Sequence, residues 1–175
     1  MVFTDHFRQQ LKSHIKPGSR VAELYHGEKE DILETLAGLV TDKGVVYGVD
    51  LLNPFESHEN MQRLRRMPNV QLLKFSIPPL PSQATSLDAV VIREFVWTYP
   101  GPEKSKENPD TYKAIDGSMN VGGYLILHLN DAESRREIFF PKYVQTVDRQ
   151  LRHFRLTYHF RDVLIYRKVR SASLR

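Results

Sequence analysis

Apolar positions along the chain follow two spacings, which together predict strands alternating with helices. Short apolar runs rich in β-branched residues predict strands over residues 20–25, 45–50, 70–75, 87–92, 124–129, 154–158 and 163–169. Helix-type patterns predict helices over residues 5–14, 31–40, 57–67, 112–119 and 140–151. Glycines mark two turns that lead into strands, one at Lys16-Pro17-Gly18 and one at Gly122-Gly123.

This order of elements predicts an α/β fold. Strands that are continuous apolar runs and alternate with helices indicate a doubly wound, mostly parallel, seven-stranded sheet with helices on both faces. The last two strands have no helix between them, so they predict an antiparallel C-terminal hairpin. We expect a single domain over residues 1–175, with a short helix at 5–14, a core over 15–151 and a strand pair over 152–170.

Composition excludes several kinds of chemistry. The 175 residues include no cysteine, which excludes disulfides, zinc-thiolate sites, iron–sulfur clusters and thiol nucleophiles. No apolar run approaches the ~18 residues of a membrane span, and the first residues resemble no signal peptide, so we expect a cytoplasmic protein without a membrane partner. The histidines do not pair with carboxylates at ligand spacing, so no metal site is expected.

The net charge of +4 is unevenly distributed. Residues 149–175 contain eight basic side chains and one acidic side chain, whereas the preceding residues carry a small acidic excess. Within this basic segment, charged and bulky residues alternate over 155–161, a pattern that suits an RNA or acidic protein partner. The alternative is that charges on an edge strand prevent it from pairing with another sheet. The oligomeric state is not predicted.

Four segments carry a family resemblance over about residues 15–169. The first segment, 16–24, leads into the first strand, and the second, 44–50, is a strand that ends in Asp50. The third segment, 87–93 with 96–100, is the fourth strand with the loop after it, and the fourth, 119–127, contains a glycine pair before the fifth strand. In this order and spacing, they resemble the class I, Rossmann-like methyltransferases that depend on S-adenosylmethionine. The resemblance implies S-adenosylmethionine as the cofactor.

The resemblance also implies a cofactor site at the carboxyl ends of the strands. Asp50 follows Gly27 by twenty-three residues and ends the second strand, where a carboxylate can bind ribose hydroxyls. Its alternative role is a turn or cap beside Asn53-Pro54. Leu51 and Ile77 would flank the adenine. The full set of implied cofactor residues is Glu23, Tyr25, His26, Gly27, Asp50, Leu51, Ser76, Ile77 and Arg93.

The loop after the first strand departs from the family's pattern Glu-Leu-Gly-x-Gly-x-Gly. The sequence from Glu23 to Lys29 keeps only the middle glycine, Gly27, and places Tyr25 and Lys29 where a Cβ obstructs close approach of the cofactor. Ser76 stands where many members have an acid or amide. Two functions follow: a methyltransferase of unknown acceptor, or a catalytically inactive domain of this fold that serves as a binding or assembly module.

Candidate catalytic residues follow the fourth strand. Glu94 is placed to act as a general base and Arg93 to anchor a substrate, although both could instead form an ion pair or a solvated loop edge. His128 and Asp131 after the fifth strand are weaker candidates, because a lone histidine there is more often structural. A single helix before the first strand and a short loop after the fourth leave little chain for a lid, which favours a macromolecular acceptor.

Overall fold

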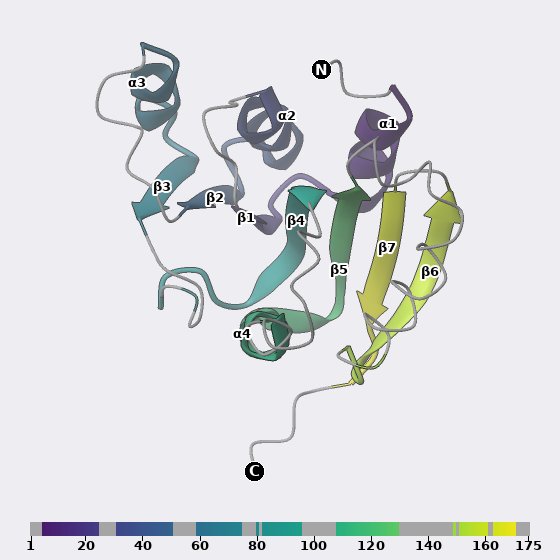
Figure 1. Ribbon diagram of the computed structural model, residues 1–175. Helices are drawn as coiled ribbons and strands as arrows, with labels where there is room; N and C mark the ends of the chain where they lie inside the picture. The colour runs from purple at the N-terminus through teal and green to yellow at the C-terminus, as the bar shows by residue number, and fades with distance from the viewer. Residues whose placement is uncertain are drawn as a thin grey trace.

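The computed structural model describes residues 5–24, 31–50, 59–74, 80, 82–95, 108–129, 149, 151–160 and 163–170. Within them lies a seven-stranded sheet in the order β3-β2-β1-β4-β5-β7-β6 (Figure 1). The strands are β1 (Arg20–Leu24), β2 (Val45–Asp50), β3 (Val70–Lys74), β4 (Leu87–Phe95), β5 (Met119–Leu129), β6 (Phe154–Phe160) and β7 (Val163–Lys168). The helices are α1 (Asp5–His14), α2 (Asp31–Val40), α3 (Glu59–Arg65) and α4 (Asn108–Ser118).

Strand directions confirm the predicted fold class. Parallel pairing joins β3, β2, β1, β4 and β5, while β7 runs antiparallel to both β5 and β6. From β1 the chain builds outward through β2 and β3, then returns to place β4 on the other side of β1. The point where the strand order reverses therefore lies between β1 and β4, and ligands of doubly wound sheets bind beyond the carboxyl ends of such strands.

Helices cover both faces of the sheet, as the sequence predicts. Figure 1 shows α1, α2 and α3 on one face and α4 on the other. Successive strand residues point to opposite faces, so Val21 packs in the cluster with α1 and α2, while its neighbour Ala22 packs in the cluster with α4. Each strand therefore contributes to two apolar cores. Among the described residues, no helix is long and apolar enough to cross a membrane.

The glycine pair before β5 differs from its prediction. Gly122 and Gly123 lie inside β5, which begins at Met119, and the pairing with β4 is irregular at this point. Gly122 has a φ of +92°, and a Cβ on Gly123 would lie 3.0 Å from the carbonyl oxygens of Asn120 and Asp88. The glycine pair therefore marks an irregularity within a strand and not a turn before it. Glycine is common at both kinds of position, because it adopts backbone conformations that other residues avoid.

Several helix boundaries also differ: α3 ends at Arg65 and α4 at Ser118, where the predictions end at residues 67 and 119. α4 begins at Asn108, four residues before the predicted start at 112, because Pro109 fits the first turn of a helix, where its missing N–H costs no hydrogen bond. Of the helix predicted over 140–151, Arg149 is helical and Leu151 is not. The rest of that helix lies outside the described residues.

Polar side chains bind the backbone together at the amino ends of the strands. The Asp88 carboxylate accepts hydrogen bonds from the Arg20 backbone N–H at 2.9 Å and from the Asn120 side-chain amide at 3.0 Å, which links β1, β4 and β5. At the same edge Lys168, only 3% exposed, donates from Nζ to the carbonyls of Asp116 and Met119. These contacts attach the end of β7 to the end of α4.

Candidate functional site

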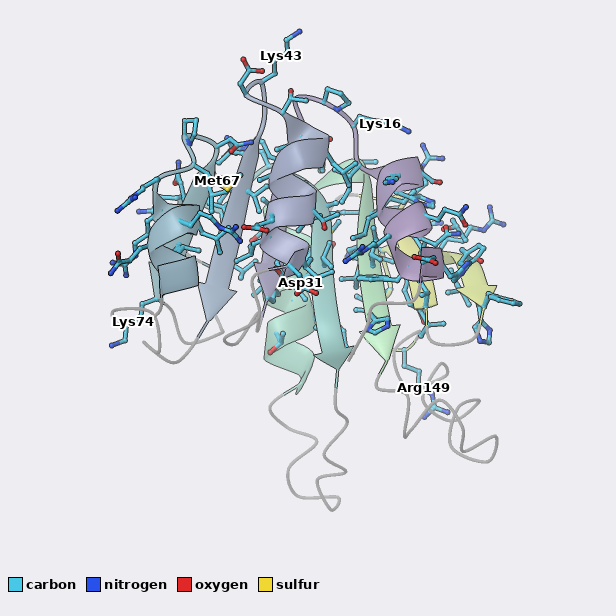
Figure 2. The ribbon with its side chains drawn as sticks, turned by 90° about the horizontal axis from the view of Figure 1, so that it is seen from above. Lys16, Asp31, Lys43, Met67, Lys74 and Arg149 are labelled. Atoms are coloured by element: carbon cyan, nitrogen blue, oxygen red, sulfur yellow. The ribbon has the colours of Figure 1, made fainter. Side chains whose placement is uncertain are left out.

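The carboxyl ends of the parallel strands meet at one edge of the sheet. In the register, Leu24 of β1 lies between Val49 of β2 and Ile92 of β4. Figure 2 shows the start of α2 at Asp31 near this edge, with Lys16 and Lys43 at the opposite edge. The candidate site is this carboxyl edge, centred on the point between β1 and β4 where the strand order reverses.

Among the residues predicted to bind the cofactor, Glu23 is the one whose side chain the structure describes. It is the penultimate residue of β1 and is fully buried (0% exposed). Its neighbours in the register, Gly48 and Val91, contribute no polar side chain. Its position near the end of β1, beside the reversal of strand order, places this buried carboxyl group next to the candidate site.

Asp50 is the last residue of β2, as predicted, and it pairs in the register with Lys74, the last residue of β3. Sequence reasoning missed Lys74, which is exposed and lies at this edge (Figure 2). The sequence pattern ends one strand at Asp50 and the next at residue 75, one residue beyond Lys74. Knowing that the two ends are neighbours required the strand order.

Arg93 and Glu94 lie within β4 rather than beyond it, which corrects the prediction that the strand ends at residue 92. The pairing with β5 is irregular here: Ile92 faces Leu127 and Phe95 faces Leu129, so β4 has one extra residue between these pairs. Such bulges bend a strand and redirect its side chains, and they are common beside active sites. No simple sequence pattern announces this bulge.

His128 lies near the end of β5 and is 6% exposed. The Phe7 ring of α1 packs against its imidazole, with 4.6 Å between ring centroids. This burial under α1 favours the structural interpretation of His128 over a catalytic one. The other weak candidate, Asp131, lies outside the described residues.

The first turn of α2, near the same edge, is acidic. Asp31 and Glu34 lie in that turn, where carboxylates are favoured by the positive end of the helix dipole. Glu34 forms an ion pair with Arg63 of α3, and Lys74 lies at the same edge. Glu23 and Asp31 are the other acidic groups described here. The described residues contain no group of three side chains able to hold a metal ion. Six predicted cofactor residues lie outside the described residues: Tyr25, His26, Gly27, Leu51, Ser76 and Ile77.

Comparisons with known proteins give the fold. No family model and no curated protein matches the sequence. Among solved structures, a Clostridium thermocellum protein provisionally named an rRNA methylase has a TM-score of 0.64 at 15% identity, covering 98% of this chain and 100% of its own. An Aquifex aeolicus SAM-dependent methyltransferase has a TM-score of 0.64 at 17% identity, covering 94% and 89%. A Thermotoga maritima SAM-dependent O-methyltransferase has a TM-score of 0.66 at 13% identity, covering 99% and 68%.

The chain has the class I methyltransferase fold. The resemblance inferred from the sequence motifs is thereby confirmed at the level of the fold.

The described residues fit the cofactor that the class I methyltransferase fold implies. S-adenosylmethionine carries an ammonium and a sulfonium group, and the acidic groups of Glu23 and Asp31 at this edge attract positive charge. It also carries a ribose, and Asp50 ends β2, where a carboxylate can accept hydrogen bonds from ribose hydroxyls. The same acidic groups repel the cofactor's own carboxylate, which therefore needs a partner elsewhere.

Proposed function

We propose that the protein is a methyltransferase that binds S-adenosylmethionine at the carboxyl ends of β1, β2 and β4. The observation that supports this most strongly is the reversal of strand order between β1 and β4. It brings the strand ends that carry Glu23, Asp50 and the bulge at Arg93 and Glu94 to one edge of the sheet. Cytoplasmic location and a single-domain organisation are part of the same proposal.

Each cofactor residue has a proposed role. Asp50 accepts hydrogen bonds from the ribose hydroxyls, and Leu51 with Ile77 flanks the adenine, with Ser76 beside it. Glu23 attracts the positive groups of the methionine portion, since a buried carboxylate acts in a medium of low dielectric constant. Tyr25, His26 and Gly27, which follow β1 in the sequence, contact that portion.

Two residues of the β4 bulge act on the acceptor. When bound, the cofactor supplies a methyl group on a positively charged sulfur. The protein's main contribution is to hold the acceptor in line with that methyl group, because positioning provides much of the rate enhancement in such transfers. Arg93 anchors the acceptor, and Glu94 takes a proton from it where the acceptor must lose one. We propose a macromolecular acceptor.

Calorimetric titration with S-adenosylmethionine and S-adenosylhomocysteine tests the proposal. We expect micromolar dissociation constants, and a weakening of about a hundredfold in Asp50→Ala, because two hydrogen bonds to a carboxylate are lost. The matched control is Asp42→Ala, which removes an exposed carboxylate from the turn before β2 and should leave binding unchanged. Absence of heat at millimolar ligand would contradict the proposal.

A second candidate function is a catalytically inactive domain that binds or assembles with a partner. It is favoured by the sequence of the loop after β1, where Tyr25 and Lys29 replace two glycines of the family pattern. The double variant Tyr25→Gly, Lys29→Gly separates the two functions. If these side chains block the cofactor, the double variant binds S-adenosylhomocysteine and the wild-type protein does not. If both bind it equally, these side chains do not block the cofactor, and the loop no longer favours an inactive module.

A further inference from the structure

The side of the β6–β7 hairpin that faces α1 carries two arginines and a row of aromatic rings. We call it the hairpin surface and define it by five side chains: Arg155, Tyr158 and Phe160 of β6, Arg167 of β7 and His6 of α1. β6 is the last strand of the sheet, beside β7 (Figure 1). None of these residues belongs to the candidate cofactor site.

The two arginines lie directly opposite each other. Arg155 and Arg167 are register partners on neighbouring antiparallel strands, and both are exposed. They share the face of α1, because the flanking pairs on either side, Phe154 with Lys168 and Leu156 with Tyr166, contribute to the opposite face. Like charges directly opposite on a sheet destabilise it. A polyanion that contacts both arginines reduces that repulsion.

An irregularity in β6 places the aromatic rings on this same face. The register shifts between Leu156 and Tyr158, so Leu156 packs in the core on the α4 side and Tyr158 packs on the α1 side. Strict alternation along the strand would have put both on one face. The bulge thus sets Tyr158 on the same side of the sheet as the arginine pair.

Contacts with α1 hold the rings in place. The Tyr158 hydroxyl and His6 Nε2 form a hydrogen bond of 2.9 Å, and the two rings stack at 5.8 Å between centroids. Phe160 meets His6 edge to face at 5.1 Å and remains 47% exposed. A large aromatic side chain that is fixed yet half exposed offers a face on which a nucleobase can stack.

The hairpin surface leads toward the candidate site. β5 and β6 are both antiparallel to β7, so they run in the same direction. Phe160, at the end of β6, therefore lies toward the carboxyl edge, and the Arg155–Arg167 pair lies toward the amino edge. A polymer bound along β6 would pass from the arginine pair to the edge that holds the proposed cofactor site.

We propose that the hairpin surface binds single-stranded nucleic acid, with phosphates at Arg155 and Arg167 and a base stacked on Phe160. The role of nucleic acid as the methyl acceptor rests on the proposed function. The binding of nucleic acid does not, because it needs no cofactor. The basic excess of residues 149–175 favours a polyanion. An acidic protein would satisfy the arginines and leave the aromatic face unused, and a second copy of this chain would present the same positive charge. Arg161 lies outside the described residues.

Fluorescence anisotropy with a labelled single-stranded RNA of twenty nucleotides and mixed sequence tests the proposal, with a DNA of the same sequence in parallel. Both share the phosphate backbone, so both should bind, and tighter binding of RNA would identify the ribose hydroxyl as a further contact. The double variant Arg155→Gln, Arg167→Gln should bind about tenfold more weakly. The slope of log affinity against log salt should fall by about 1.4, because each lost phosphate contact contributes about 0.7 for single strands.

The matched control removes the same charge elsewhere. The double variant Arg65→Gln, Arg66→Gln changes two exposed arginines at the end of α3, on the β3 side of the sheet. Its affinity should stay within about twofold of wild type, and its salt slope within about 0.3. Equal losses in both double variants would overturn the proposal, since they would show attraction to net charge alone. So would equal affinity for poly-L-glutamate, which carries charge without bases.

Phe160→Leu tests the stacking contact. Leucine keeps an apolar side chain and removes the aromatic face, so affinity should fall about fivefold or more with little change in salt slope. Unchanged affinity in this variant would overturn the stacking part of the proposal. Failure of the proposed function gives a different result: S-adenosylhomocysteine would not bind, while RNA binding and its dependence on Arg155 and Arg167 would persist.

Discussion

The two edges of the sheet use polar side chains differently. At the amino edge, Asp88 and Lys168 bind backbone and side-chain groups of neighbouring elements. At the carboxyl edge, Glu23 is fully buried near the end of β1, next to where the strand order reverses. We therefore expect substitutions at the amino edge to lower folding stability, and substitutions at the carboxyl edge to lower ligand affinity.

The largest expected effect is at the amino edge. Lys168→Met should lower the free energy of unfolding by about 2–4 kcal/mol, because it leaves two carbonyls and the Asp116 carboxylate without their buried cation. Urea denaturation measures the change. The control Lys113→Met removes an exposed lysine from α4 and should stay within about 0.5 kcal/mol of wild type. A loss of less than about 1 kcal/mol in Lys168→Met would remove the distinction between the two edges.

A smaller loss is expected for Asp88→Ala. The variant removes the acceptor for the Arg20 N–H and for the Asn120 amide, so the free energy of unfolding should fall by about 1–3 kcal/mol. Affinity for S-adenosylhomocysteine, measured by calorimetry on the folded variant, should match that of wild type. A weakening of affinity comparable to that of a carboxyl-edge variant would show that the two edges are not independent.

Unlike Asp88→Ala, Glu23→Gln should lower cofactor affinity more than folding stability. The side chain keeps its shape and loses its charge, so affinity for S-adenosylmethionine should fall about tenfold because a buried charge no longer faces the cofactor's positive groups. The midpoint of urea denaturation should move less than in Asp88→Ala. A large stability loss with unchanged affinity would assign Glu23 to the fold rather than to the site.

Much of the fold could be predicted because its signals are local. The helix over 31–40 and the strand over 45–50 have the predicted boundaries, since each combines a clear apolar spacing with a turn at its end. Predictions failed where pairing between strands decides the outcome. Gly122 and Gly123 entered β5, and Arg93 and Glu94 entered β4, because bulges depend on the neighbouring strand's register.

The candidate site could be predicted only in part for the same reason. The sequence places Glu23 and Asp50 at strand ends, and the structure puts them there. The sequence does not reveal that Lys74 pairs with Asp50 or that Arg155 pairs with Arg167. Both pairs depend on the order and register of the strands. Local patterns give the residues, and only the assembled sheet gives their partners.

The central claim is that a ligand of the S-adenosylmethionine class binds the carboxyl edge. Hydrogen exchange followed by mass spectrometry, with and without saturating S-adenosylhomocysteine, tests it most directly. We expect slower exchange in peptides that span the end of β1 with the start of α2 and the end of β2, and unchanged exchange in residues 82–88 at the amino edge. Unchanged exchange throughout, or slower exchange at the amino edge alone, would contradict it.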